Sequence, residues 1–251
     1  MRKNFGLALI LLFYFVVGSL LSAEHESQPA NAVKIFGRVT DFEGQPIKGA
    51  MVFLKDARFE DVATAKSDED GRYSLSAPKG RYMALAAVKH YMMKYLEYWA
   101  WNVPADQDLE INPRIDRMEV YAINAWQPQG AHPSYQIYFR PMSLSMVMAR
   151  IKEAGSMADF QKLPVLNIAP ELGKDDIKVV IDNQHVNILE VNRVCEAAGE
   201  NQHMFGYLIQ VSLPAKKIDQ SYSSLTITLI DPATGDKGEG CFFIVPPDYM
   251  N

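Results

Sequence analysis

Residues 67–82 of the chain read SDEDGRYSLSAPKGRY and decide the fold of its first half. The segment 68–71 is a tight hairpin signal, because Gly71 supplies the positive φ that such a turn needs. Polar and apolar residues then alternate over 72–75, which is typical of a half-buried β-strand. A second turn signal, rich in proline and glycine, follows at 78–80. The stretch therefore predicts antiparallel strands joined by short turns.

The same pattern of short alternating runs continues on both sides of this stretch. The runs are 33–39, 50–54, 62–66, 72–75 and 82–88. Turn residues separate them, for example EGQP at 43–46. Strands at this spacing predict a small antiparallel β-sandwich. No helical period of useful length occurs before residue 140.

Four blocks in this region occur in an order that resembles a known family. They are GRVTD at 37–41, GQPIKGAMV at 44–52, SDEDGRYSL at 67–75 and PKGRY at 78–82. With these blocks the first half resembles the carboxypeptidase regulatory-like domain. The resemblance implies a transthyretin-like sandwich of seven strands that serves as a non-catalytic accessory or binding module. The zinc peptidase domain that accompanies it in the namesake enzymes has no counterpart in this sequence.

The second half of the chain shows further short runs of strand type. They are 118–123, 135–139, 177–181, 186–191, 205–213, 225–230 and 241–245. Turn residues separate these runs too, for example DPATG at 231–235. Together they predict an immunoglobulin-like β-sandwich, so the expected fold class is all-β with two sandwiches. We divide the chain accordingly into a first module, 33–115, and a second module, 116–251.

One segment of the second module, near 143–162, departs from the strand pattern. Apolar residues recur there at helical spacing, Gly155 ends the run, and Ser156 is the expected N-cap of another short helix. Two roles stay open for this insertion: a lid over the open end of the sandwich or a protein-docking element. The docking alternative rests on flexible methionine side chains, which adapt to a partner. These are Met146, Met148 and Met157.

The first residues have the layout of a secretory signal peptide. Arg2 and Lys3 precede a short apolar core, and small residues follow up to Ala23. The core is shorter than the ~20 residues that span a bilayer, which favours cleavage after residue 23 over an uncleaved anchor. Residues 24–32 are polar and form the expected linker. Removing 1–23 changes the net charge from -5 to -7. We therefore expect a secreted or periplasmic protein whose mature chain has no transmembrane span.

Local signatures of catalysis and of cofactor binding are missing from the sequence. The five histidines are scattered, and there is no Gly-x-Ser-x-Gly elbow, phosphate-binding loop or Cys-x-x-Cys pair. A net negative chain without a basic run also gives nucleic acid no electrostatic footprint. We therefore expect no enzyme activity, no cofactor, no metal site and no nucleic-acid partner.

Two cysteines, Cys195 and Cys241, are too few for a disulfide-rich scaffold. Both lie in the second module, and an oxidising compartment permits a bond between them. The sequence leaves two alternatives open: a disulfide, or two separate buried thiols.

Aromatic residues crowd the end of the first module. The candidate ligand-binding residues are Tyr91, Tyr95, Tyr98, Trp99 and Trp101, with Trp126 as an addition if the modules fold together. On a strand, Trp99 and Trp101 would share one face and Tyr98 would occupy the other. Exposed rings would stack on sugars or hold an apolar peptide. The alternative is that the rings fill the first core and the contact between the modules.

The sequence therefore favours a non-catalytic binding or scaffolding protein of the bacterial cell envelope that recognises carbohydrate or a protein partner. The alternative is a hydrolase or a peptidase-associated enzyme with a site between the modules. That site would use loop residues brought together in space, such as Glu97, Asp116 and His132.

Overall fold

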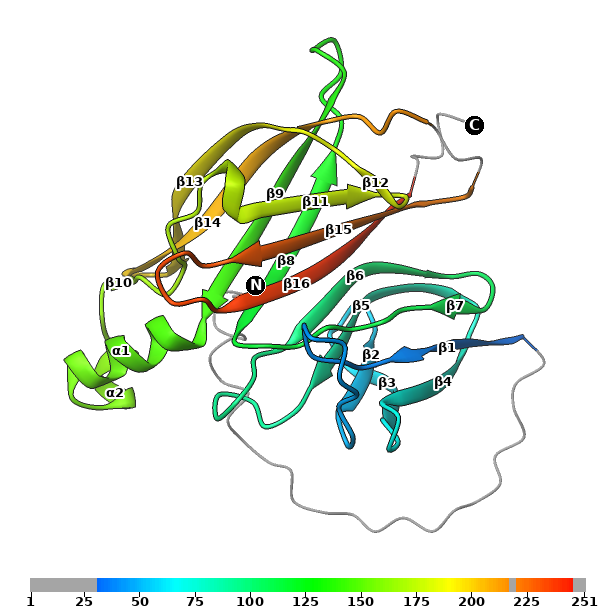
Figure 1. Ribbon diagram of the computed structural model, residues 1–251, viewed down its shortest axis with the longest axis horizontal. Coiled ribbons are helices and arrows are strands. Elements are labelled where there is room, and N and C mark those ends of the chain that lie inside the picture. The colour runs from blue at the N-terminus through cyan, green and yellow to red at the C-terminus, as the bar shows by residue number, and fades with distance from the viewer. Residues whose placement is uncertain (1–30, 217–219, 246–251) are drawn as a thin grey trace.

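A computed structural model describes residues 31–216 and 220–245 of the chain and shows strands in almost every element (Figure 1). The expected all-β class with a short helical insertion is confirmed. The expected signal peptide, 1–23, and most of the expected linker, 24–32, lie outside the described residues.

The first module contains seven strands. They are β1 (Ala32–Arg38), β2 (Met51–Lys55), β3 (Asp61–Lys66), β4 (Arg72–Pro78), β5 (Gly80–Val88), β6 (Tyr98–Ala105) and β7 (Leu109–Glu110). The predicted turn at 68–71 joins β3 to β4, and Gly71 has a φ of 76° there. A Cβ on Gly71 would lie 2.4 Å from the carbonyl oxygen of Val39, so this turn requires glycine for space as well as for φ.

Two layers enclose the core of the first module. The sheet β4-β1-β7 forms one layer, and strands β3, β2, β5 and β6 of a larger sheet form the other. Alternate residues of β4 are buried: Tyr73, Leu75 and Ala77. The phenol of Tyr73 donates a hydrogen bond to the carbonyl oxygen of Ile111 at 2.8 Å, which satisfies its buried hydroxyl.

Asn102 reverses the alternation of side chains within β6. Its φ of 57° is left-handed, a conformation that asparagine tolerates better than most residues. Before it, Tyr98 and Ala100 face the first core, whereas after it Val103 and Ala105 do. The Asn102 side-chain amide donates to the carbonyl oxygen of Phe243 at 2.7 Å, which holds the kink against the strand at 237–244.

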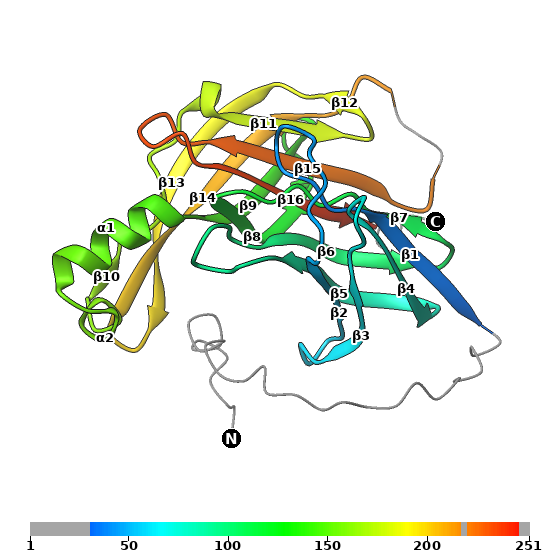
Figure 2. The same cartoon turned by 60° about the horizontal axis from the view of Figure 1, so that its bottom comes forward.

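The second module contains the remaining strands and the helical insertion. They are β8 (Met118–Trp126), β9 (Ser134–Ser143), α1 (Leu144–Ala154), α2 (Met157–Phe160), β10 (Val165–Leu166), the 3-10 helix η2 (Lys174–Asp176), β11 (Ile177–Ile181), β12 (Gln184–His185), β13 (Ile188–Gly199), β14 (Gln202–Ser212), β15 (Ser223–Ile230) and β16 (Lys237–Ile244). Strands β13, β14, β9 and β8 run side by side, as do β11, β15 and β16 (Figures 1 and 2). Ile137, Phe139, Ile209 and Ile227 are fully buried between these two layers.

The helical insertion begins and ends where the sequence predicts. Ser143 caps α1 by accepting a hydrogen bond from the backbone N–H of Met146, and Gly155 ends the helix with a φ of 89°. Ser156 caps α2 in the same way through the N–H of Asp159. The apolar faces of α1 and α2 pack on one end of the second module, where Val147 and Phe160 are buried.

Strand β16 joins the two modules along one of its edges, because its other edge pairs with β15. Its first residues pair with β8 and its middle residues pair with β6, both in parallel. Cys241 and Phe243 lie in the first core, whereas Phe242 and Ile244 pack against the second. The last strand of the second module therefore completes the core of the first.

Buried polar contacts fix the start of this strand. Asp236 is buried, and its carboxylate accepts hydrogen bonds from Arg117, Ser143 and Ser145 over 2.7–3.0 Å. Glu239 is also buried and accepts from the guanidinium of Arg114, with Nε at 2.9 Å. Because each carboxylate has a cationic partner, its burial is compensated.

Two glycines let β16 approach β8 closely. A Cβ on Gly238 would lie 2.6 Å from the carbonyl oxygen of Met118, and a Cβ on Gly240 would lie 2.5 Å from that of Val120. Both neighbours are backbone atoms, which cannot move aside without disturbing the strand. Glycine is therefore required here for close packing and not for a special φ.

We expect Gly240→Ala to lower the free energy of unfolding by about 3 kcal/mol, because the added methyl group overpacks the join between the modules. Gly80→Ala is the matched control, since a Cβ at Gly80 meets nothing within 4 Å. The control should be neutral or slightly stabilising. Urea denaturation of both variants measures the difference, and equal stabilities would contradict this view of the join.

Candidate functional site

The aromatic segment at the end of the first module lies on β6 and on the loop before it. Trp99 and Trp101 share one face of the strand, as predicted, with ring centroids 5.2 Å apart and planes inclined by 22°. Phe59, from the turn between β2 and β3, stacks on both rings at 5.7 and 6.2 Å. On β5, Ala84 and Ala86 lie opposite these tryptophans, and their small side chains leave room for the indoles.

Side chains of the second module cover these rings. The contact is called the seam here, and its members are Ala84, Ala86, Trp99 and Tyr121, with Phe59, Trp101, Ala122 and Met142 partly buried around them. Tyr121 and Ala122 come from β8 and Met142 comes from β9. The stacked rings are therefore mostly enclosed between the modules.

This burial corrects part of the predicted binding surface. Tyr98 is 4% exposed in the first core and Trp99 is 3% exposed in the seam, so neither presents a ring face to a ligand. Tyr91, Tyr95 and Trp101 are partly buried. The physical reason is that the core of a small sandwich, and the seam between it and the second module, need large side chains to exclude water.

Trp126 differs from the other candidates because it is 46% exposed. It is the last residue of β8, five positions beyond Tyr121 in the seam. At the usual rise per residue of a strand, this places it roughly 16 Å along the sheet from the seam. Trp126 therefore does not join the aromatic segment and belongs to a separate surface.

That surface is the face of β8, β9, β14 and β13 that points away from the second core and lies beyond the seam, called the outer face here. Trp126 lies opposite Gln136, and Gln136 lies opposite Gln210. Residues directly opposite each other point to the same side of a sheet. The polar and aromatic members of the outer face are Asn124, Trp126, Gln136, Tyr138, Arg140, Glu190, Asn192, Glu196 and Gln210.

A hydrogen-bonded network orders the middle of the outer face. The guanidinium of Arg140 donates to both carboxylate oxygens of Glu196, at 2.7 and 2.8 Å, and the phenol of Tyr138 donates to the same carboxylate. Burial works to raise the pKa of Glu196, but the hydrogen bonds from Arg140 and Tyr138 outweigh it and hold that pKa below its usual value. Gly206 leaves space for this network, since a Cβ there would lie 2.9 Å from the Tyr138 hydroxyl.

Sequence reasoning missed every member of the outer face except Trp126. The members come from four strands that are widely separated along the chain. The available signal was the alternation on β9, where Gln136, Tyr138 and Arg140 interleave with the buried Ile137 and Phe139. Alternation predicts that such residues point away from the core, but not which other strands lie beside them.

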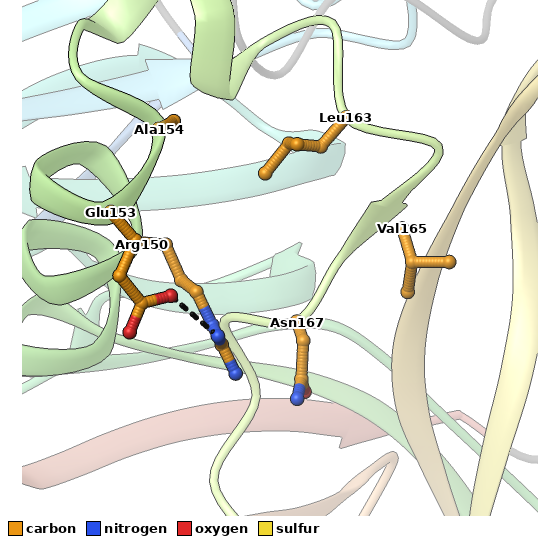
Figure 3. A pocket seen from close by; sticks show the side chains of 6 residues that line it. All are labelled: Arg150, Glu153, Ala154, Leu163, Val165 and Asn167. Atoms are coloured by element: carbon orange, nitrogen blue, oxygen red, sulfur yellow. Dashed lines mark hydrogen bonds and ion pairs between the residues drawn. The ribbon is translucent and has the colours of Figure 1, made fainter.

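A shallow cavity of about 340 Å³ opens between α1 and β10 (Figure 3). It is lined by Arg150, Glu153, Ala154, Leu163, Val165 and Asn167. Arg150 pairs with Glu153 at 2.7 Å, so the charge at its rim is balanced. The predicted helical insertion thus forms one wall of a hollow, and exposed Met148 lies on the same helix.

Two acidic residues, one buried and one half-buried, also meet at the seam. Glu119 on β8 is 2% exposed, and its Oε2 accepts a hydrogen bond from the backbone N–H of Glu97 at 3.3 Å. Burial raises the pKa of Glu97 to about 7, although Lys55 opposes this shift. Burial and the charge of Glu97 raise the pKa of Glu119 as well.

The residues of the catalytic alternative are only partly brought together. Leu96, next to Glu97, donates its N–H to the carbonyl oxygen of Asp116 at 2.8 Å, so these two segments are adjacent. His132 lies in the exposed hairpin between β8 and β9. Within 31–216 and 220–245, no group of three His, Cys, Asp or Glu side chains is arranged to hold a metal ion. No helix in the described part of the chain is long and apolar enough to cross a membrane.

The two cysteines are free thiols. Cys195 is exposed on β13, whereas Cys241 is buried on β16 in the first core. The structure thus has no disulfide between them. It also differs from the alternative of two separate buried thiols, because Cys195 is exposed. Burial raises the pKa of the Cys241 thiol to about 12.

We expect the native protein to be alkylated at Cys195 alone. Because the thiolate is the reactive form, Cys241 should react on the order of a thousandfold more slowly until the protein is denatured. Intact-mass measurement after iodoacetamide treatment, with and without denaturant, tests this. Cys195→Ser is the control and should take up no label in the native state. Rapid double labelling of the native wild type would contradict the burial of Cys241.

Comparison with known proteins identifies the class of the first module. Residues 34–113 match the family model of the carboxypeptidase regulatory-like domain, which confirms the resemblance found in the sequence. No curated protein matches the chain.

Several solved structures are similar at low identity. A DUF3823 family protein from Parabacteroides merdae is 11% identical, with a TM-score of 0.27 over 86% of this chain and 100% of its own. BcpA, the major pilin subunit of Bacillus cereus, is 11% identical, with a TM-score of 0.28 over 85% of this chain and 68% of its own. The Bacillus anthracis TIE protein is 10% identical, with a TM-score of 0.28. The match covers 44% of this chain and 28% of the length of that protein. These scores are too low to assign a shared fold for the whole chain.

Proposed function

We propose that this chain is a non-catalytic carbohydrate-binding protein, secreted or periplasmic, of the bacterial cell envelope, and that it binds sugars on the outer face of its second module. The observation that carries the proposal is the exposed ring of Trp126, which lies in one cross-strand row with the side-chain amides of Gln136 and Gln210 on one side of a sheet. The sheet holds these groups on a rigid base, so little entropy is lost when a ligand binds.

The chemistry of the outer face suits sugar hydroxyls. A side-chain amide both donates and accepts hydrogen bonds, as a hydroxyl does. The amides of Gln136 and Gln210 lie opposite each other on β9 and β14, and Asn192 lies on the next strand, β13, two residues along from the position opposite Gln210. The indole of Trp126 offers a large apolar surface for the C–H face of a sugar ring. Arg140 and Glu196 are paired with each other, and exposed Glu190 leaves the face with one net negative charge, which disfavours an anionic ligand.

A sugar suits this face better than a protein does. A protein interface has an apolar centre from which charged residues are depleted. The middle of the outer face instead holds the Arg140–Glu196 pair, and Trp126 is its one exposed large apolar residue. The cavity beside α1 and β10 is the more apolar surface, and it is the place to test if a protein partner is found.

We expect Trp126→Ala to weaken glycan binding about tenfold, because stacking of an aromatic ring contributes on the order of 1 kcal/mol beyond the area it buries. Gln136→Ala should weaken binding by a similar factor through lost hydrogen bonds. A glycan array identifies the ligand, and titration calorimetry with that glycan measures each variant.

Phe36→Ala is the matched control, because Phe36 is a 37% exposed aromatic residue on β1 of the first module. It should leave affinity unchanged. Wild-type affinity in Trp126→Ala and Gln136→Ala, or the absence of binding to any glycan on the array, would contradict the proposal.

A further inference from the structure

Glu97 and Glu119 occupy an unusual position, since each comes from a different module, and half-buried Glu97 lies beside fully buried Glu119. Glu97 lies on the loop directly before β6, and Glu119 lies on β8. The backbone N–H of Glu97 reaches the carboxylate of Glu119 at 3.3 Å, which fixes the two residues side by side. The charge of Glu97 acts on the carboxylate of Glu119, so the two groups repel each other when both are ionised, and the burial of Glu119 strengthens the repulsion.

The groups around the pair do not neutralise it. Lys55 on β2 is the cation that acts on Glu97, and it is already paired with Asp61 on β3 at 2.6 Å. The phenols of Tyr91 and Tyr121 face Glu119 from the loop and from β8, and neither carries a positive charge. Arg140, beyond Tyr121, is held in its bidentate pair with Glu196.

The remaining charged neighbours are also occupied. Glu239, paired with Glu119 across β8 and β16, binds Arg114. Asp236 binds Arg117 at the start of β16. Unlike these two carboxylates, Glu97 and Glu119 share the seam with each other and with uncharged rings. The pair can therefore reduce its combined negative charge by keeping one proton.

We propose that Glu97 and Glu119 form a pH-dependent latch between the two modules, closed while the pair holds a proton and loosened when both carboxylates are ionised. The latch is independent of sugar binding, because it lies at the seam and not on the outer face. Its two halves belong to different modules, so their repulsion acts directly across the contact.

The direction of the effect follows from the raised pKa. In the unfolded chain Glu97 loses its proton near its ordinary pKa of 4.5, whereas in the folded protein it does so near 7. A raised carboxyl pKa stabilises the fold below about 4.5, and that contribution is lost as the pH rises through 7. The seam is therefore tighter in mildly acidic solution than in alkaline solution.

The positions of the tryptophans provide a direct readout. The chain has three, of which Trp99 and Trp101 lie in the seam and Trp126 is exposed. In a Trp126→Phe background, fluorescence therefore reports on the seam alone. We expect its emission maximum to move to longer wavelength as the pH rises from 5 to 9, with a midpoint near 7 and with unchanged far-ultraviolet circular dichroism.

Two substitutions in that background test the assignment. Glu119→Gln removes one charge while keeping the shape of the protonated acid, and it should abolish the shift and make the melting temperature independent of pH between 5 and 8. Glu97→Gln should do the same. Asp182→Asn is the control, because Asp182 is a buried carboxylate of the second module that binds the N–H of Ser224 at 2.8 Å, away from the seam. It should leave the shift intact.

Three results would overturn the latch. They are a fluorescence maximum that does not move between pH 5 and 9, a shift that persists in both glutamine variants, and a loss of circular dichroism at the same midpoint, which would mean global unfolding.

Discussion

Strand β16 is the constraint on which the rest of the structure depends, because its side chains belong to two hydrophobic cores at once. Successive residues of a strand point to opposite faces. Cys241 and Phe243 therefore fill the first core while Phe242 packs against the second. A slip of one residue would exchange these two sets and leave both cores badly filled. The close approach to β8 at Gly238 and Gly240 holds the register.

Buried charge is used in two opposite ways around this strand. Glu239 and Asp236 each have an arginine partner, Arg114 and Arg117, from the segment that joins the modules. Such pairs tolerate little displacement, because a separated partner would leave an uncompensated buried charge. Glu97 and Glu119 instead approach each other without a cation of their own. The paired carboxylates hold the modules together at any pH at which they stay ionised, whereas the unpaired ones make the contact depend on protons.

The sequence predicted the strands and helix ends well wherever the signal is local. Ser143 and Gly155 bound α1 as expected, since capping and left-handed ends depend on a few neighbouring residues. It also predicted that Trp99 and Trp101 share a face, because period two is a property of any strand. The contact between the modules was one of two alternatives for that face, and the structure supports it. The covering residues, Tyr121 and others of β8 and β9, could not be named from the sequence, because they come from other strands. The outer face was hidden for the same reason.

By itself, the sequence determined the all-β class, the helical insertion and the family of the first module, all of which follow from turn residues, caps and alternation within short segments. Only the tertiary structure decided that β16 serves both cores, that Cys195 and Cys241 remain free and that Tyr98 and Trp99 are enclosed. It also decided that Trp126 stands among amides on an open sheet face. These properties depend on contacts between residues far apart along the chain, and no local pattern encodes which distant strands become neighbours.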